Sequence, residues 1–364
     1  MAEFFANYGL FLLKVITFVI AILIVVFAIA MLGSRGRKSA SEGRIEITKL
    51  NEQLDDMKEA LSFSLLDDEA QKLAAKEKKA EEKAERKANK TAAKKAKKQR
   101  GDGETVVSES TKDRVYVIDF DGDIRASAVE NMRREISAIL TAANENDEVV
   151  LRLESGGGMV TSYGLAASQL DRIKDKKVPL TICVDKVAAS GGYMMACVAD
   201  KLIAAPFAVL GSIGVVAQIP NFHRLLKQFN IDFETLTAGK YKRTLTMFGE
   251  NTDEGREKFV EDIERIHAQF KTYVNDRRPV LDIEKIATGE IWSGQDVLDN
   301  ALADELQTSD AYLMNKCADS EVIKVEYKKK KTMSERFSIG IQNTTDGLIM
   351  RWLDRALKAR FTIG

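Results

Sequence analysis

Hydrophobic and polar positions alternate along most of the chain with two different periods. Short apolar runs typical of β-strands are found at residues 115–118, 148–153, 178–184 and 201–205. Segments with the 3.6-residue periodicity of amphipathic helices are found at residues 124–144, 159–174, 190–199 and 251–278. Strands that alternate with helices favour an α/β fold in which the strands pair in parallel.

A long apolar segment precedes this alternating region. Leu10–Leu32 contains 23 residues and is interrupted only by Lys14 and Thr17, which is enough to cross a hydrocarbon core of about 30 Å. Ala-Ile-Ala at 28–30 resembles the cleavage site of a secretory signal peptide, which is the alternative. The first nine residues contain no Lys or Arg, however, and the apolar run continues past this site. The pattern therefore favours a retained transmembrane anchor over residues 1–36, with the span at about 10–32.

Residues 37–110 connect the predicted anchor to the alternating region. A short heptad pattern consists of Ile47, Leu50, Leu54, Met57 and Leu61. It predicts an amphipathic helix, either on the surface of the domain or as part of a coiled coil. Residues 71–100 contain 13 basic and 4 acidic residues and no large apolar residue after Leu73. This segment is expected to be a charged helix or a disordered spacer, and it could also bind anionic lipid.

A second amphipathic segment ends the chain. Residues 331–364 form a C-terminal extension in which apolar residues recur at helical spacing between residues 346 and 361. Such a segment can pack on the domain, lie on a membrane or join subunits.

Composition excludes several classes of function. The whole chain has 55 basic and 55 acidic residues, without the basic excess typical of a nucleic-acid binder. Its three cysteines, Cys183, Cys197 and Cys317, are spaced neither as a disulfide framework nor as a metal site. We therefore expect no nucleic-acid partner and no metal site. The chain has only two histidines, His223 and His267.

Candidate chemistry lies in two glycine-rich turns, each directly after a predicted strand. They are Gly156–Gly158 and the Ser190–Gly192 segment. Glycine lets the backbone approach a bound group closely, and N–H groups at the start of a helix can bind negative charge. Two such turns facing each other could form an oxyanion hole. Ser190 is then a candidate nucleophile, although serine at this position is also a common helix cap.

A serine nucleophile needs a base. Both histidines lie on predicted amphipathic helices, away from the glycine-rich turns, and are expected to be surface or packing residues. A lysine can act instead if burial favours its neutral form. Lys240 and Lys242 follow Gly239 in a segment that also contains apolar residues. From the residues alone, this segment could equally be a solvated basic loop.

Three motifs in order make the chain similar to a known protease family. They are Ala189–Tyr193, Gly211–Val215 and Ala238–Arg243. Together they resemble the signal peptide peptidase A family over roughly residues 112–325, and the chain is most similar to the family's SohB branch. The resemblance implies a serine protease domain at about 111–330, with a Clp protease/crotonase-like fold of repeated strand–strand–helix units.

The resemblance also assigns roles to individual residues. It implies that Ser190 is the nucleophile and Lys242 the general base of a Ser–Lys dyad, and that Ser212 orients the lysine. It implies that Gly157 and Gly191 donate to the oxyanion. The family usually has proline where this chain has Gly156, so Gly158 remains an alternative to Gly157.

These roles imply a membrane-anchored serine endopeptidase that needs no cofactor, forms homo-oligomers and degrades cleaved signal peptides or other membrane-associated polypeptides. The expected location is a bacterial inner membrane. The resemblance implies a periplasmic catalytic domain, whereas Arg35, Arg37 and Lys38 after the anchor favour the cytoplasm. The alternatives are a crotonase-like acyl-CoA enzyme and a non-catalytic membrane scaffold.

Overall fold

The computed structural model describes five parts of the chain. These are residues 13–14, 17–18, 43–67, 70–71 and 113–329. Most of the predicted anchor and of the spacer, and the whole C-terminal extension, lie outside them. Residues 45–327 form one compact unit. Within the described ranges, no helix has the length and the apolar character needed to span a bilayer.

The compact unit is a mixed α/β structure. Its strands are β1 (Arg44–Lys49), β2 (Arg114–Gly122), β3 (Glu148–Ser155), β4 (Leu180–Val184), β5 (Val187–Ala189), β6 (Lys201–Ala204), β7 (Val209–Gly211), β8 (Ile291–Trp292), β9 (Glu305–Leu306) and β10 (Glu321–Lys328). Its helices are α2 (Leu50–Ser64), α4 (Val129–Ala142), α5 (Val160–Asp175), α6 (Gly191–Ala196), α7 (His223–Gln228), α8 (Asp253–Arg277), α9 (Ile283–Ile286), α10 (Gln295–Asp299) and α11 (Ser309–Asp319). The strands and helices predicted from periodicity are therefore confirmed, with small shifts at their ends.

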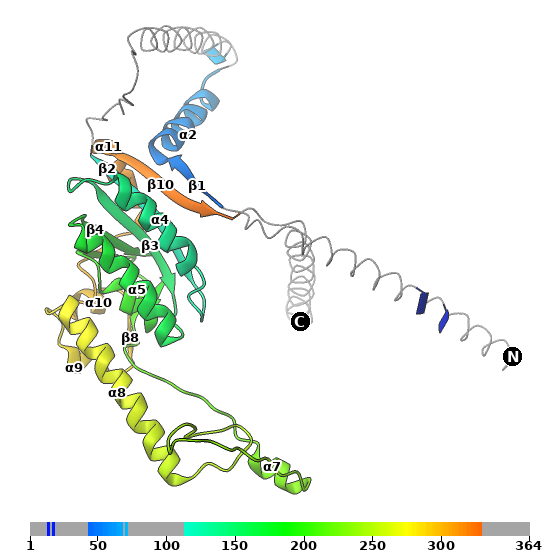
Figure 1. Cartoon of the computed structure of the whole chain (residues 1–364). Coiled ribbons are helices and arrows are strands. Elements are labelled where there is room, and N and C mark those ends of the chain that lie inside the picture. The colour runs from blue at the N-terminus through cyan, green and yellow to red at the C-terminus, as the bar shows by residue number, and fades with distance from the viewer. Residues whose placement is uncertain (1–12, 15–16, 19–42, 68–69, 72–112, 330–364) are drawn as a thin grey trace, which may run out of the picture. The chain divides into compact units, whose positions relative to one another are not determined.

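The sheet is built mainly from parallel strands. Its main path runs β1-β10-β2-β3-β4-β6-β9, and each pair from β10 to β9 is parallel. Helices α4, α5 and α6 pack beside one another on one face (Figure 1). This arrangement fits the Clp protease/crotonase-like fold that the sequence resemblance implied.

Successive side chains of β2 enter two different cores, one on each face of the sheet. Tyr116, Ile118 and Phe120 belong to the large core beneath the helices α4 to α6. Val115 and Val117 point to the other face, where Tyr312 of α11 joins a smaller core. Because successive side chains of a strand point to opposite faces, a strand buried on both faces needs a continuous apolar run.

The sheet divides at the end of β3, and this division creates the candidate site. The first half of β3 pairs with β4, whereas its last residue, Ser155, pairs with Ala188 of β5. Strand β5 also pairs in parallel with β7, which pairs antiparallel with β8. The turn after β5 therefore lies beside the turn after β3.

The region after residue 43 differs from the heptad prediction. Ile47 lies on β1 and not on a helix, because residues 44–49 join the sheet beside β10. The helix begins at Leu50, and none of its residues is buried. Asn51 connects it to the domain: its side-chain amide donates to the carbonyls of Cys317 and Ser320 at 2.9 and 3.0 Å. The folded unit thus includes an N-terminal strand and helix that precede residue 111.

Residues 216–250, which we call the arm, extend away from the sheet between β7 and α8 (Figure 1). The arm carries α7 and contains a small aromatic cluster, in which the Phe248 ring lies 6.0 Å from that of Phe222 and 5.6 Å from that of Phe233. After the arm, Thr252 caps α8 by accepting a hydrogen bond from Gly255 N–H at 3.1 Å. Helix α8 then returns to the core, where Phe270 and Val274 are buried.

Candidate active site

Ser190 occupies a sharp turn between β5 and α6. Its φ and ψ are 52° and −119°, a backbone conformation that side chains other than glycine rarely adopt. A hydrogen bond from Ser190 N–H to the Gly211 carbonyl, 2.8 Å long, holds the turn against the end of β7. Strained residues of this kind are concentrated at functional sites. The observed strain therefore supports Ser190 as a reactive residue over its interpretation as a simple helix cap.

The turn after β3 contacts the Ser190 turn directly. Gly157 has a positive φ of 86°, and a Cβ atom there would lie 2.7 Å from Gly191 N and 2.8 Å from Ser190 Cβ. Only glycine fits this position. The structure thus brings together the two glycine-rich turns that the sequence singled out.

The geometry favours Gly158 over Gly157 as an oxyanion donor. The N–H of Gly157 donates to Ser155 Oγ at 3.0 Å, so it is not free for a substrate. Gly158 lines the same cavity as Ser190 and Gly191. Gly191 is the first residue of α6, where backbone N–H groups have no partner within the helix. Sequence reasoning left the choice open and preferred Gly157; the hydrogen bond to Ser155 is the physical reason to exchange it for Gly158.

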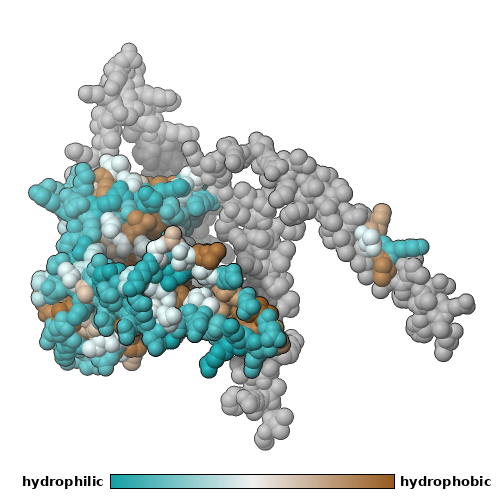
Figure 2. Space-filling view, turned by 60° about the horizontal axis from the view of Figure 1, so that its bottom comes forward, coloured by the Kyte–Doolittle hydropathy of each residue, from teal (hydrophilic) through white to brown (hydrophobic). Residues whose placement is uncertain are grey.

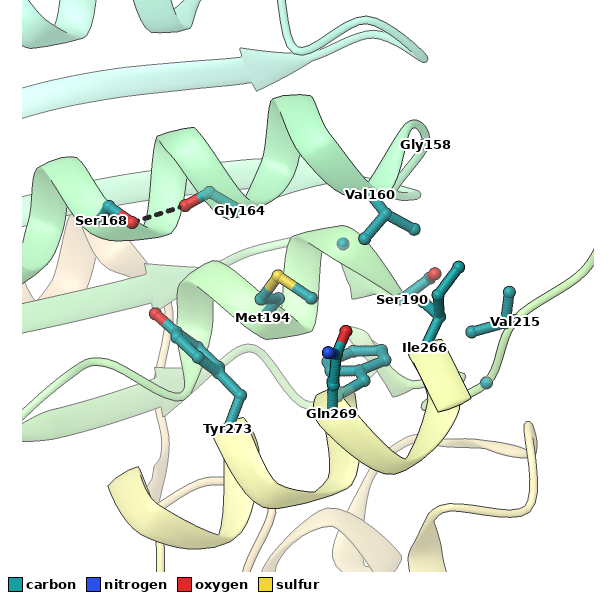
Figure 3. Close-up of a pocket in the computed structure, with 13 residues that line it drawn as sticks. Gly158, Val160, Gly164, Ser168, Ser190, Met194, Val215, Ile266, Gln269 and Tyr273 are labelled. Carbon is teal, nitrogen blue, oxygen red and sulfur yellow. Dashed lines mark hydrogen bonds between the residues drawn. The ribbon is translucent and has the colours of Figure 1, made fainter. Parts of the chain in front are cut away.

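An apolar cavity of about 310 Å³ opens beside Ser190. One side comes from α5, where Val160, Gly164 and Ser168 succeed one another at helical spacing. The opposite side comes from α8 through Ile266, Gln269, Phe270 and Tyr273, and Met194 lies between them (Figure 3). Sequence reasoning predicted these segments only as amphipathic helices and missed the cavity, because a residue that lines a cavity and one that fills a core have the same periodicity.

The structure does not place Lys242 beside Ser190. Lys242 lies on the arm, its side chain is exposed, and it is not among the residues that line the cavity. Within one chain the predicted dyad is therefore not assembled, because the arm that carries the lysine does not pack on the domain that carries the serine. Ser212, the predicted orienting residue, follows β7 directly and has a positive φ of 49°. Ser212 is thus adjacent to Gly211, whose carbonyl accepts the hydrogen bond from Ser190 N–H.

Lys240, the other lysine of the motif, is engaged elsewhere. Its ammonium group forms an ion pair with Glu254 at 2.5 Å. This contact with Glu254 raises the pKa of Lys240, which favours the charged form and makes Lys240 a poorer base. Lys240 is therefore a poor candidate for the base.

Other nucleophiles and bases lie outside the site. His223 lies on α7 of the arm, and His267 lies on α8 without lining the cavity. Both Cys183 and Cys197 are buried, and burial raises the pKa of each thiol to about 12. Neither would be a thiolate at neutral pH.

Known proteins and family models are similar to this chain over most of its length. The model of the N-terminal region of peptidase family S49 matches residues 3–170, and the model of peptidase family S49 matches residues 172–322. The probable protease SohB of Haemophilus influenzae is 48% identical over 350 residues, which cover 96% of each chain. A probable protease SohB of Buchnera aphidicola subsp. Schlechtendalia chinensis is 46% identical over 314 residues, covering 86% of this chain and 100% of that one.

A more distant similarity covers part of the chain. Protease 4 of Haemophilus influenzae is 25% identical over 201 residues, which correspond to 53% of this chain and 32% of that protein. Two family models that together span most of the sequence, and relatives that are similar over nearly all of it, agree with one another. The chain belongs to peptidase family S49, as a SohB-type protease.

Proposed function

We propose that this peptidase is a membrane-anchored serine endopeptidase in which Ser190 is the nucleophile and Lys242 the general base. The observation that carries the proposal is the position of Ser190. It lies on a strained turn, in contact with a second glycine-rich turn, at the wall of an apolar cavity. Nucleophile, oxyanion donors and a place for a substrate side chain are thus within one site.

The reaction is acyl transfer. The neutral amine of Lys242 takes the Ser190 Oγ proton as that oxygen attacks the peptide carbonyl, and the N–H groups of Gly158 and Gly191 bind the oxyanion. The C–N bond then breaks, and the leaving amine receives the proton from Lys242. Water, deprotonated by Lys242, hydrolyses the resulting ester and regenerates Ser190.

The exposed arm suggests how Lys242 reaches a serine. Its apolar side chains are exposed to an extent unusual for a soluble surface, and Leu236 is 94% exposed. The others are Val216, Ile219, Phe222, Leu225, Phe229, Ile231, Phe233, Tyr241, Met247 and Phe248. Figure 2, in which the lower part of Figure 1 comes forward, shows apolar patches set among polar surface. We infer a homo-oligomer in which the arm packs on a second copy and places Lys242 beside that copy's Ser190.

Such packing also supplies what the base requires. A lysine is neutral near pH 7 only when it is largely removed from water, and Lys242 is exposed in one chain. A second copy that covers the arm and the cavity would exclude water from both.

The cavity supports apolar polypeptide substrates. Its walls consist mainly of aliphatic, aromatic and glycine residues, which favour an apolar side chain next to the cleaved bond. Cleaved signal peptides and other membrane-associated polypeptides are rich in such residues. We propose these as substrates, with the catalytic domain on the periplasmic face of a bacterial inner membrane. A reporter fused to the C-terminus tests the side of the membrane.

Three full-length variants test the catalytic proposal. Hydrolysis of casein and of an apolar peptide is measured for Ser190→Ala, Lys242→Ala and Lys240→Ala. We expect the first two to lose at least about 10³-fold in kcat, since each removes one partner of a catalytic unit, and Lys240→Ala to stay within about threefold of wild type.

Two results would contradict the assignment. Full activity in Lys242→Ala together with loss in Lys240→Ala would show that the other lysine is the base. Full activity in Ser190→Ala would remove the serine mechanism, and acyl-CoA turnover or a purely structural role would then have to be tested.

A further inference from the structure

Ser155 and Tyr163 lie directly behind the two glycine-rich turns, and the mechanism above assigns no role to either side chain. Ser155 is 2% exposed and Tyr163 is fully buried. The Tyr163 ring packs directly under Gly191: a Cβ atom on that glycine would lie 2.8 Å from the tyrosine Cβ and Cδ2 atoms. Ser155 ends β3, and Tyr163 belongs to the first turn of α5.

Hydrogen bonds connect the two side chains to the first glycine-rich turn. Gly157 N–H donates to Ser155 Oγ at 3.0 Å, Ser155 Oγ lies 2.5 Å from Tyr163 Oη, and Tyr163 Oη donates to the Asp123 carbonyl at 2.8 Å. A carbonyl only accepts, so the phenol proton points to Asp123, and the Ser155 proton must point to Tyr163. The Ser155 hydroxyl also lies 3.5 Å from the Gly122 carbonyl, a longer contact than its 2.5 Å contact with Tyr163 Oη.

Burial keeps the phenol in this series of hydrogen bonds protonated. It raises the pKa of Tyr163, so the phenol remains a donor at neutral pH. Space is also fully used, since a Cβ atom on Gly122 would lie 2.5 Å from Ser155 Oγ and 2.6 Å from Tyr163 Oη. A side chain at position 122 would therefore displace both hydroxyl groups.

We propose that Ser155 and Tyr163 are positioning residues that hold the N–H groups of Gly158 and Gly191 at the spacing an oxyanion needs. The first turn consists of three glycines, so none of its own side chains can hold its conformation. The hydrogen bond from Gly157 N–H to Ser155 Oγ holds it instead. The Tyr163 ring supports Gly191 from below. One pair of side chains thus connects both donors, whose distances to an oxyanion must lie within a few tenths of an ångström. The inference rests on the proposed function.

Two substitutions in the full-length protein test it. Tyr163→Phe keeps the ring and removes the hydroxyl, after which the Ser155 proton has only the Gly122 carbonyl, 3.5 Å away. Ser155→Ala leaves Gly157 N–H without a partner. We expect kcat to fall at least about tenfold in Tyr163→Phe and about 10²-fold in Ser155→Ala, approaching the loss caused by removing an oxyanion donor.

The split between kinetic constants separates positioning from general destabilisation. KM for a peptide should stay within about twofold of wild type, whereas binding of a peptide aldehyde, which forms the tetrahedral oxyanion, should weaken in proportion to kcat. Tyr312→Phe is the matched control. It removes another buried phenol hydroxyl, which donates to Glu148 at 2.6 Å on the opposite face of the sheet. We expect it to leave kcat and aldehyde binding unchanged.

The outcomes distinguish the two proposals. Loss of activity in Ser190→Ala with full kcat and full aldehyde affinity in Tyr163→Phe and Ser155→Ala would overturn the positioning role alone. Full activity in Ser190→Ala would overturn the proposed function, and the positioning role with it. An equal fall of kcat in Tyr312→Phe and Tyr163→Phe would show that Ser155 and Tyr163 act only as core residues and do not position the oxyanion donors.

Discussion

The backbone of Ser190 stores strain that a glycine would not have. A residue other than glycine at φ 52°, ψ −119° costs about 1–3 kcal/mol, which surrounding contacts must offset. We expect Ser190→Gly to be inactive and more stable to unfolding than Ser190→Ala by about 1 kcal/mol, because both lack the hydroxyl and only glycine relaxes at this φ. Chemical denaturation of the two variants measures the difference. Equal stability would show that the turn is not strained.

The sequence identified the two glycine-rich turns of the candidate site, but not the hydrogen bonds that hold them. A serine and glycines after predicted strands could be recognised from the chain alone, and the structure brings these turns into contact. The exchange of Gly157 for Gly158, and the roles of Ser155 and Tyr163, depend on how α5 packs under two loops. Long-range packing of this kind leaves no periodic signal in the sequence.

At the scale of elements, a glycine in the middle of α5 keeps the cavity open. A Cβ atom on Gly164 would have no atom within 4 Å, so Gly164→Ala should stabilise the helix by about 0.5–1 kcal/mol. Gly164→Leu should fill the cavity instead. We expect the leucine variant to lose at least about tenfold in kcat/KM for peptides with a large apolar residue before the cleaved bond.

The substrate series provides the control for this prediction. Peptides with alanine at that position need little of the cavity, so both variants should cleave them at nearly the wild-type rate. Thermal unfolding checks that Gly164→Leu is folded. An equal loss for alanine and leucine peptides would show that the cavity does not hold the substrate side chain.

A buried carboxyl group connects α4 to β10 and makes this contact sensitive to pH. Glu135 is 5% exposed and accepts a hydrogen bond from Tyr327 N–H at 2.7 Å. Burial raises the pKa of Glu135 to about 7, above its usual value. The folded state thus binds this proton more tightly than the unfolded state, and the stabilisation is lost as pH rises from about 4.5 through about 7.

Replacing this carboxyl group should remove that part of the pH dependence. We expect Glu135→Gln to lose less stability than wild type between pH 5 and pH 8, by at most about 3 kcal/mol. Glu130→Gln, which changes an exposed carboxylate on the same helix, should keep the wild-type slope. Denaturation at the two pH values measures both. An unchanged slope in Glu135→Gln would contradict the assignment.

Four of the longer strands were predicted from the sequence, and the shortest strands were not. The eight-residue strand β10 and the eleven-residue helix α11 were not predicted either. Strands β2, β3, β4 and β6 have four or more residues and apolar sequences that stand out. Strands β5, β7 and β8 have two or three residues, too few for any alternation to be visible. Yet these short strands place Ser190 beside the turn after β3. The start of α2 was misplaced because Ile47 fits two patterns at once: the alternation of β1 and the heptad spacing to Leu50.

At the scale of the whole molecule, the serine and the lysine lie on different parts of the chain. If the arm of one copy serves the cavity of another, two inactive proteins can restore each other. We expect a mixture of full-length Ser190→Ala and Lys242→Ala to hydrolyse peptide, since mixed oligomers contain sites with an intact serine and an intact lysine. Sedimentation in detergent gives the oligomer size, and dilution should lower the rate per chain.

The same experiment can fail in an informative way. An inactive mixture of variants that do co-assemble, shown by pull-down of differently tagged chains, would mean that each site uses residues from one copy. A wild-type protein that sediments as a monomer with an undiminished rate per chain would exclude the need for assembly.

The strand order also determines when the sheet can be completed during translation. On the path of the sheet, β1 has β10 as its neighbour, and β10 lies between β1 and β2. The first strand of the compact unit must therefore wait for the last strand to leave the ribosome, with a delay of roughly 15–50 s at ordinary rates of translation. During this time β1 and α2 have no place to dock and the sheet is open at one edge. The sheet of a nascent chain thus remains incomplete, and available to the machinery that handles unfolded chains, until residues 321–328 of β10 have been made.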